Sequence, residues 1–349
     1  MLKYSLGIDI SQKDFHACLS VIDANQQVKV KASHKFSNQS TGYKELLGWI
    51  SNHRKELNIP LFIVMEATGV YYESCAMYLF KAGFELAVVL PNKAKKYMQA
   101  LGLKTKNDKI DAIGLARMGA EQCLELWQPM DDFFYTLRAL TRHHQSLQEV
   151  KTNISNQLHA DEHSIYSNKK VTKQLKKLIS TIEKEMLEMK QEIDKQVFSD
   201  PEIAKKVKHI TDIKGLGNIT VATILAETNG FTLFRSISQL VSFSGYDVVE
   251  NQSGKRTGKT RISKKGNSHI RRVLHLPAFN MIRYDVGNFR SFFDRILNRH
   301  GQKMKAYVAV QKKLLVLIYT LWKKNEAFKI DKASTQNISG EKETEPSFA

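Results

Sequence analysis

The sequence has no long apolar segment and only three cysteines among its 349 residues. Its most apolar run, residues 314–321, is far shorter than the roughly 20 residues that a membrane-spanning helix needs. Cys18, Cys75 and Cys123 form neither a CxxC pair nor a metal-ligand spacing, so we expect reduced thiols. The first residues lead directly into a predicted strand, without the pattern of a signal peptide. We therefore expect a soluble, cytoplasmic protein with no membrane partner.

Acidic residues are scarce relative to basic ones. The sequence contains 35 Asp and Glu residues and 53 Lys and Arg residues, which gives a formal net charge of +18. Such an excess indicates a polyanionic partner, and nucleic acid is the first candidate, although a membrane surface or a ribosome would also attract it. A hydrophobic content of 42% is typical of a globular protein with a core, and the length allows two domains with a spacer.

Residues 1–126 alternate between predicted strands and helices. Apolar and β-branched runs predict strands, and apolar residues at helical spacing predict helices. Residues 61–65 are apolar throughout, which is typical of a central strand buried on both faces. The order of elements is that of an α/β RNase H-like (RuvC-like) domain. The predicted elements are strands at 4–10, 16–22 and 28–36, a helix at 41–52, a strand at 61–65, a helix at 70–81, a strand at 85–90, a helix at 91–100 and a helix from 107.

Residues 127–200 predict a helical spacer. Glycine and proline are rare between 133 and 197, and Val171, Leu175 and Leu178 follow a heptad spacing. A polar stretch at 161–168 separates two helical halves. This pattern indicates an antiparallel helical hairpin or coiled coil, and two ordinary amphipathic helices of a compact domain would give a similar one.

Residues 201–328 predict a mostly α-helical C-terminal domain. Lys214, Gly215 and Gly217 lie just before an apolar helix at 221–227, in a pattern that resembles a helix-hairpin-helix turn. Glycines in such a turn let backbone N–H groups approach a DNA phosphate at a helix N-terminus. Further helices are expected at 237–243, 289–298 and 304–324, and a disordered tail at 329–349.

Four carboxylates stand at the ends of predicted elements. Asp9 lies near the end of the first strand and Glu66 follows the strand at 61–65. Asp108 and Asp111 are three residues apart in the first turn of a helix, so they share one face, and Asn107 before them is a natural N-cap. In an RNase H-like domain the first and fourth strands are neighbours, which would bring these four side chains together.

Carboxylates gathered in this way suit Mg²⁺ or Mn²⁺, which bind oxygen ligands together with substrate phosphates. Two such ions can activate the attacking oxygen and stabilise the leaving oxygen of a phosphodiester. Alternatively, the acids of the helix simply interact with its positive N-terminal dipole. Asp14, Asp23 and Glu73 are expected to be solvated.

A second candidate site is the basic segment 251–267, which contains several cations and glycines but no acid. Its composition is typical of a loop that follows a phosphate backbone, although a disordered loop would have a similar composition. One hydroxyl of the segment could attack a phosphodiester, or all of them could hydrogen-bond phosphates. The cations are Lys255, Arg256, Lys259, Arg261, Lys264 and Lys265, followed by Arg271 and Arg272; the hydroxyls are Ser253, Thr257, Thr260 and Ser263.

Several motifs together resemble one family. They are Gly7-Ile8-Asp9-Ile10-Ser11, Met65-Glu66-Ala67-Thr68-Gly69, Lys106-Asn107-Asp108-Lys109-Ile110-Asp111-Ala112 and the segment from Ser253 to Asn267. In order and spacing, from about residue 4 to 325, the chain resembles the DEDD transposases of insertion-sequence family 110, to which the Piv invertase is related. The resemblance implies a RuvC-like domain, a helical spacer and a C-terminal transposase domain.

The resemblance also implies roles for residues and partners. Asp9, Glu66, Asp108 and Asp111 would form the metal-binding tetrad, and Ser253 would be the nucleophile that becomes linked to DNA, with Ser263 as the second choice. Element-end and target DNA, a structured bridge RNA and further copies of the chain in a dimer or tetramer would be its partners, on a bacterial nucleoid. Two other functions stay open, namely a metal-dependent Holliday-junction-type nuclease that uses water and a non-catalytic nucleic-acid-binding protein.

Overall fold

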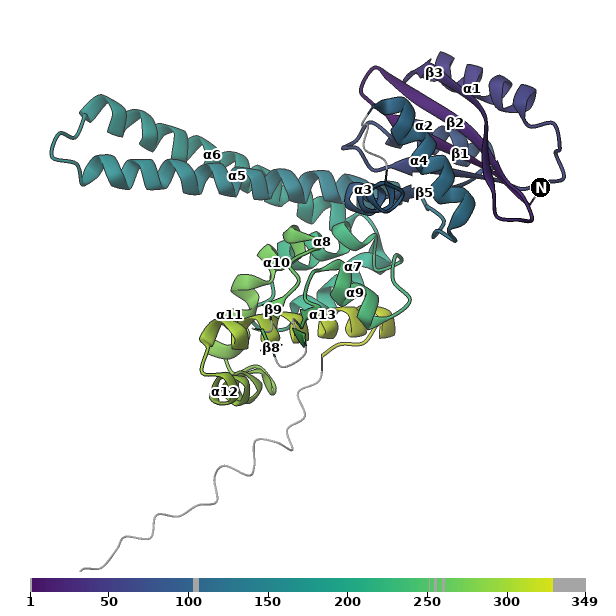
Figure 1. Ribbon diagram of the computed structural model, residues 1–349. Coiled ribbons are helices and arrows are strands. Elements are labelled where there is room, and N and C mark those ends of the chain that lie inside the picture. Colours follow the sequence, from purple (N-terminus) through teal and green to yellow (C-terminus); the bar gives the residue numbers. More distant parts are fainter. Residues whose placement is uncertain (1, 103–106, 251, 254–255, 259–260, 329–349) are drawn as a thin grey trace, which may run out of the picture. The chain divides into compact units, whose positions relative to one another are not determined.

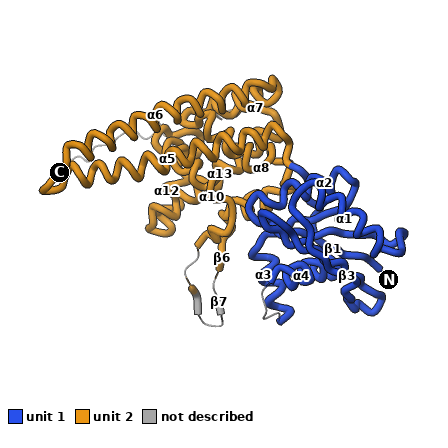
Figure 2. The backbone as a smooth tube through the Cα atoms, turned by 90° about the horizontal axis from the view of Figure 1, so that it is seen from above, with its two compact units in different colours: residues 1–129 blue, residues 130–349 orange. Residues whose placement is uncertain are grey.

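The computed structural model describes residues 2–102, 107–250, 252–253, 256–258 and 261–328. The chain forms two compact units, residues 1–129 and 130–349 (Figure 2). The two helices predicted as a spacer cluster with the second unit. The predicted disordered tail at 329–349 lies outside the described residues.

A five-stranded mixed sheet forms the centre of the first unit (Figure 1). Its order is β3-β2-β1-β4-β5, in which β1, β2 and β3 form an antiparallel meander and β4 and β5 run parallel to β1. This is the strand order expected of an RNase H-like domain. The strands are β1 (Lys3–Ile10), β2 (Asp14–Ile22), β3 (Val28–Ser37), β4 (Leu61–Glu66) and β5 (Glu85–Val89).

Helices cover both faces of this sheet. Because successive strand residues point to opposite faces, Ile63 and Met65 pack with one set of helices and Val64 packs with the other. The predicted helix at 70–81 begins only at Glu73, because Gly69 adopts a left-handed conformation (φ 58°) and a turn follows it. The helices are α1 (Ser40–His53), α2 (Glu73–Lys81), α3 (Pro91–Ala100) and α4 (Asp108–Glu121).

Glycines let α4 lie directly against the sheet. A Cβ atom on Gly7 of β1 would lie 2.2 Å from the carbonyl oxygen of Ala112, and one on Gly119 would lie 2.4 Å from Ser5 Oγ. Real Cβ atoms do not approach backbone atoms so closely, so any side chain at position 7 would push the helix away. The small residues of this interface therefore fix where α4 rests on β1.

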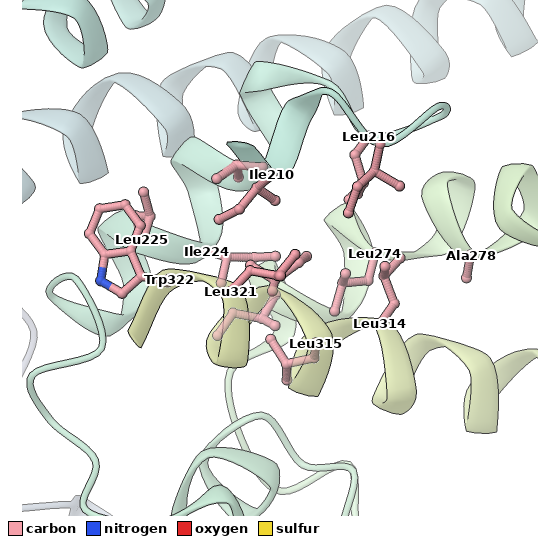
Figure 3. Packing of buried hydrophobic residues seen from close by; sticks show 14 of the residues in the cluster. Ile210, Leu216, Ile224, Leu225, Leu274, Ala278, Leu314, Leu315, Leu321 and Trp322 are labelled. Atoms are coloured by element: carbon pink, nitrogen blue, oxygen red, sulfur yellow. The ribbon is translucent and has the colours of Figure 1, made fainter. Parts of the chain in front are cut away.

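In its described residues the second unit is helical except for one arm. Two long helices, α5 (Asp132–Glu162) and α6 (Lys169–Phe198), lie side by side as the predicted hairpin (Figure 1). The core of the unit surrounds α8, whose residues are almost all buried, and includes Leu314 and Trp322 (Figure 3). The remaining helices are α7 (Pro201–Thr211), α8 (Asn218–Thr228), α9 (Ile237–Phe243), α10 (Ser268–Val273), α11 (His275–Arg283), α12 (Phe289–His300) and α13 (Lys303–Lys324). None of the helices in the described ranges is long and apolar enough to span a membrane.

The arm is a β-hairpin formed by the segment that the sequence suggested was a loop. At its base β6 (Val248–Val249) pairs with β9 (Arg261–Ile262), and further out β7 (Gln252–Ser253) pairs with β8 (Arg256–Thr257). β6 lies on a narrow extension of the second unit (Figure 2). β-branched residues at the base favour this pairing over an irregular loop. We refer to residues 248–262 as the serine hairpin.

Candidate active site

All four predicted carboxylate residues line one pocket in the first unit. Asp9, Glu66, Asp108 and Asp111 share this pocket, whose volume is about 520 Å³. A pocket of this size lies within the range of small-molecule and cofactor sites. The sequence thus predicted a set of residues, distant along the chain, that the fold brings to one place.

Strand register and helix capping place these side chains. β1 and β4 are parallel, with Ile8 of β1 opposite Met65 of β4. Asp9 and Glu66, which follow these two residues, therefore lie at the same edge of the sheet. At the helix, Asn107 Oδ1 accepts a hydrogen bond of 2.9 Å from the backbone N–H of Ile110 and fixes the first turn. The predicted N-cap is confirmed. Asp9, Glu66 and Asp111 are half-buried, whereas the side chain of Asp108 is 62% exposed.

The donor atoms of the pocket suit a hard cation. Four carboxylates supply only oxygen ligands, which Mg²⁺ and Mn²⁺ prefer over nitrogen or sulfur. Within the described residues, no three His, Cys, Asp or Glu side chains are close enough together to form a complete metal-binding group. Mg²⁺ usually keeps several waters and binds through one or two carboxylates plus substrate phosphates. The residues therefore fit such an ion, and their role as ligands stays a prediction.

The pocket also contains acidic and basic residues that the sequence did not single out. Asp14, which was expected to be solvated, lines the pocket wall with 32% of its side chain exposed and pairs with Lys35 at 2.8 Å. The hydrogen bond from Lys35 holds the pKa of Asp14 below its usual range. Lys95 on α3 adds a cation to the same wall. Beside the pocket, His16 Nδ1 is buried without a hydrogen-bond partner, 3.8 Å from Asp108 Oδ2.

A hydrogen-bonded group holds α3 on α4. The hydroxyl of Tyr97 and Nε of Arg117 each donate to the carboxylate of Glu121 at 2.6 Å. Burial, together with the Glu121 carboxylate, raises the pKa of Tyr97. For Glu121, burial opposes ionisation, but the hydrogen bonds from Tyr97 and Arg117 outweigh it and lower the pKa. These contacts fix α3, and with it Lys95, beside the carboxylates.

In the second unit, Ser253 lies on the serine hairpin. Its backbone pairs in register with Arg256, across the tip of the hairpin. Arg261, Lys264 and Lys265 are exposed. Lys255, Lys259 and Thr260 lie outside the described residues.

Other predicted residues of this segment make contacts within the protein. The Ser263 hydroxyl donates to Asp247 Oδ1 at 2.5 Å and closes the base of the hairpin. Arg271 Nη1 donates to the carbonyl oxygens of Ser244 and Gly266, and Arg272 pairs with Glu149. The two arginines therefore stabilise the fold, and their predicted contact with phosphate stays a prediction.

The glycine-containing turn predicted to bind phosphate joins α7 to α8. Gly215 has φ 97°, and a Cβ atom there would lie 2.8 Å from Cβ of Asn280. Gly217 is the exposed N-cap of α8, with open space around its Cα. Lys214 Nζ lies over the ring of Tyr284, 4.6 Å from its centre. The turn presents a helix N-terminus and a cation to solvent, and its contact with phosphate stays a prediction.

Comparison with known proteins adds independent information. A transposase family model for IS110 elements of the DEDD type matches residues 6–161, and a model of the IS116/IS110/IS902 transposase family matches residues 207–294. The pilin gene-inverting proteins of Moraxella bovis and Moraxella lacunata are each 28% identical over 331 residues, which is 94% of this chain and 98% of theirs.

Solved structures show only weak likeness. RuvC of Thermus thermophilus is 12% identical, with a TM-score of 0.28 over 36% of this chain and 99% of its own. The fowlpox virus resolvase in complex with Holliday junction DNA is 15% identical, with a TM-score of 0.24 over 32% of this chain and 93% of its own. We draw nothing from likenesses this weak. The two family models describe the same group of proteins in separate parts of the chain, which therefore belongs to the IS110 family of transposases, enzymes of DNA recombination.

Proposed function

We propose that this protein cuts and rejoins DNA strands of an insertion sequence through a covalent serine–DNA intermediate. The observation that carries the proposal is the shared pocket of Asp9, Glu66, Asp108 and Asp111 in a chain of the transposase family. Phosphodiester chemistry needs negative charge on the phosphate to be neutralised. Four carboxylates supply no positive charge themselves, so their function would be to hold the cations that do.

In the proposed reaction Ser253 Oγ attacks a phosphorus atom of the DNA backbone. The serine hydroxyl gives up its proton and its oxygen bonds to phosphorus. The bond from phosphorus to one sugar oxygen breaks, and that sugar oxygen takes up a proton, so no proton is gained or lost overall. The new ester keeps the energy of the broken bond, so a sugar hydroxyl of another strand can later reverse the step and join the strands. Mg²⁺ or Mn²⁺ held by the carboxylates would supply Lewis-acid stabilisation of the phosphate oxygens. The exposed Arg261, Lys264 and Lys265 would hold the DNA backbone.

The proposed partners follow from charge and family. We propose element-end and target DNA, a structured bridge RNA that guides the choice of target, and a homo-oligomer of two or four chains. In that oligomer the carboxylates of one protomer would act with Ser253 of another. The net charge of +18 supports a nucleic-acid partner in the cytoplasm, on the nucleoid. The turn at 213–217 would act as a helix-hairpin-helix phosphate contact, and α5 with α6 as a coiled-coil spacer.

The chemistry is tested by trapping the intermediate. The full-length protein is incubated with a radiolabelled duplex that carries an element end, with Mg²⁺ or with EDTA, and then denatured. We expect a labelled protein band that resists denaturation and depends on the metal. Cleaved DNA without this band would identify a nuclease that uses water. If neither the band nor cleaved DNA forms, the protein binds nucleic acid without catalysis.

Guidance by RNA has a separate test. The protein is purified from the bacterium that carries its gene, and the RNA bound to it is sequenced. We expect enrichment of a structured transcript from the DNA that flanks the gene, at least about tenfold over total RNA, a difference of roughly 1.4 kcal/mol. RNA with the composition of the total pool would contradict guidance and leave the proposed serine chemistry unaffected.

A further inference from the structure

A buried carboxylate, paired with a half-exposed arginine, lies where three segments of the second unit meet. Glu227 of α8 is 4% exposed. Its carboxylate accepts two hydrogen bonds from Arg142 of α5, at 2.6 and 2.8 Å, and one from Asn267 Nδ2 at 2.6 Å. Asn267 also caps α10, because its Oδ1 accepts from the N–H of Ile270 at 3.0 Å. One carboxylate thus joins α5, α8 and the start of α10.

Two further contacts join the same side of α5 to residues of α10. His269 Nδ1 hydrogen-bonds Gln145 Oε1 at 2.5 Å, and Arg272 pairs with Glu149. Arg142, Gln145 and Glu149 are spaced three and four residues apart, so they form one stripe of the helix. This polar stripe of α5 therefore contacts the residues that follow the serine hairpin.

Asn267 is connected in turn to the base of the serine hairpin. Its backbone N–H donates to the carbonyl oxygen of Phe243 at 2.7 Å, and the Lys264 N–H donates to that of Gly245 at 3.2 Å. Next along the chain, Ser263 bonds Asp247 through both its backbone and its hydroxyl. Hydrogen bonds between residues 243–247 and residues 263–267 therefore connect Asn267, the partner of Glu227, to the first pair of hairpin strands.

Stability alone is a poor reason for this arrangement. Burying a charged group often contributes no more than apolar residues of the same shape, and such groups can instead fix a particular geometry. Here the Glu227 carboxylate is buried, whereas the side chain of Arg142 stays 46% exposed. Burial opposes ionisation of Glu227, but Arg142 and Asn267 outweigh it and lower its pKa. The surroundings of Glu227 on α8 are otherwise apolar residues and threonines. The hydrogen bonds of Glu227 fix its orientation relative to Arg142 of α5, whereas a leucine at this position would make apolar contacts that have no preferred direction.

We infer that Glu227 is a positioning residue of the recombination reaction, which holds the serine hairpin on α5 and α8 through Asn267. The inference rests on the proposed role of Ser253. An isolated two-stranded hairpin is marginally stable, so the arm that carries Ser253 depends on how its base is held. Fixing the base of the arm limits the positions that the serine can sample, and small displacements of reacting groups reduce rates strongly.

The test compares Asn267→Asp, Glu227→Gln and the double variant in the full-length protein. Asp at position 267 can still cap α10 but places a second negative charge beside Glu227. The double variant keeps the cap and the net charge of the cluster. Glu183→Gln is the matched control, because it removes another partner of α5, the Lys151–Glu183 pair at 2.7 Å, away from the hairpin.

Hydrogen exchange by mass spectrometry and adduct formation are the two measurements. For Asn267→Asp we expect about tenfold faster exchange over residues 244–265, equal to roughly 1.4 kcal/mol. The rate of adduct formation should fall by a similar factor with the DNA concentration at half-maximal rate unchanged, and both changes should partly reverse in the double variant. Exchange that is unchanged at 244–265, or faster by the same factor across the whole second unit, would overturn the inference. Absence of any adduct in the wild-type protein would instead refute the proposed function of Ser253, and the exchange data would still show whether the hairpin is anchored.

Discussion

Replacing Asp9 by Asn should lower the rate of DNA strand cleavage by about a thousandfold or more, equal to roughly 4 kcal/mol of transition-state free energy. Asn keeps the size of the side chain but removes the negative charge that a divalent cation needs. Asp111→Asn should have a similar effect, because both residues are half-buried in the same pocket. The measurement is the single-turnover rate of cleavage of a labelled element end at saturating Mg²⁺.

Asp23→Asn provides the control. Asp23 Oδ1 accepts hydrogen bonds from the backbone N–H groups of Asn25 and Gln27 in a turn, and an Asn side chain offers the same acceptor. This variant should cleave at the wild-type rate. DNA binding by Asp9→Asn should stay within about threefold of wild type, since the loss concerns the transition state and not the bound substrate. Full cleavage activity in both pocket variants would disprove the carboxylate site.

The sequence predicted the carboxylate pocket because its residues mark the ends of regular elements. A buried strand is recognisable from a continuous apolar run, and the residue after it lies at the edge of the sheet, as Glu66 does. Asn107 showed where α4 begins through its capping side chain. The place of Asp14 in the pocket wall was not predicted, because it depends on the turn that joins β1 to β2, where the N–H of Ser11 donates to the Asp14 carbonyl oxygen. Local patterns do not indicate which wall of a pocket such a turn will form.

The second unit was less predictable for a related reason. Glycines and cations at 251–267 resemble a loop, and the β-branched residues that pair at its base, Val248 and Ile262, are fourteen positions apart. The Arg142–Glu227–Asn267 cluster joins residues 85 and 40 positions apart. An acid inside an apolar helix is visible in the sequence as an anomaly, yet its partner becomes known only when the helices pack. Contacts of this kind are set by tertiary structure, so periodicity alone does not reveal them.

Ser253→Ala should abolish the denaturation-resistant adduct, with a loss of at least about ten thousandfold, or roughly 5.5 kcal/mol. The alanine lacks the oxygen that would bond to phosphorus, so no residual covalent product is expected from this position. The backbone of Ser253 pairs with that of Arg256, and the substitution leaves those backbone groups unchanged. Binding of the labelled duplex should therefore remain within about threefold of wild type, because the proposed phosphate contacts are made by cations and not by Ser253.

Ser263→Ala separates the two candidate nucleophiles. The Ser263 hydroxyl already donates to Asp247 at the base of the serine hairpin, so its loss should loosen the arm and slow adduct formation by a fewfold without preventing it. Mass spectrometry of the trapped peptide identifies the modified residue directly. An adduct that persists in Ser253→Ala and disappears in Ser263→Ala would transfer the role of nucleophile to Ser263. The site of attack would then lie at the base of the hairpin, where Asp247 accepts the hydrogen bond of the Ser263 hydroxyl.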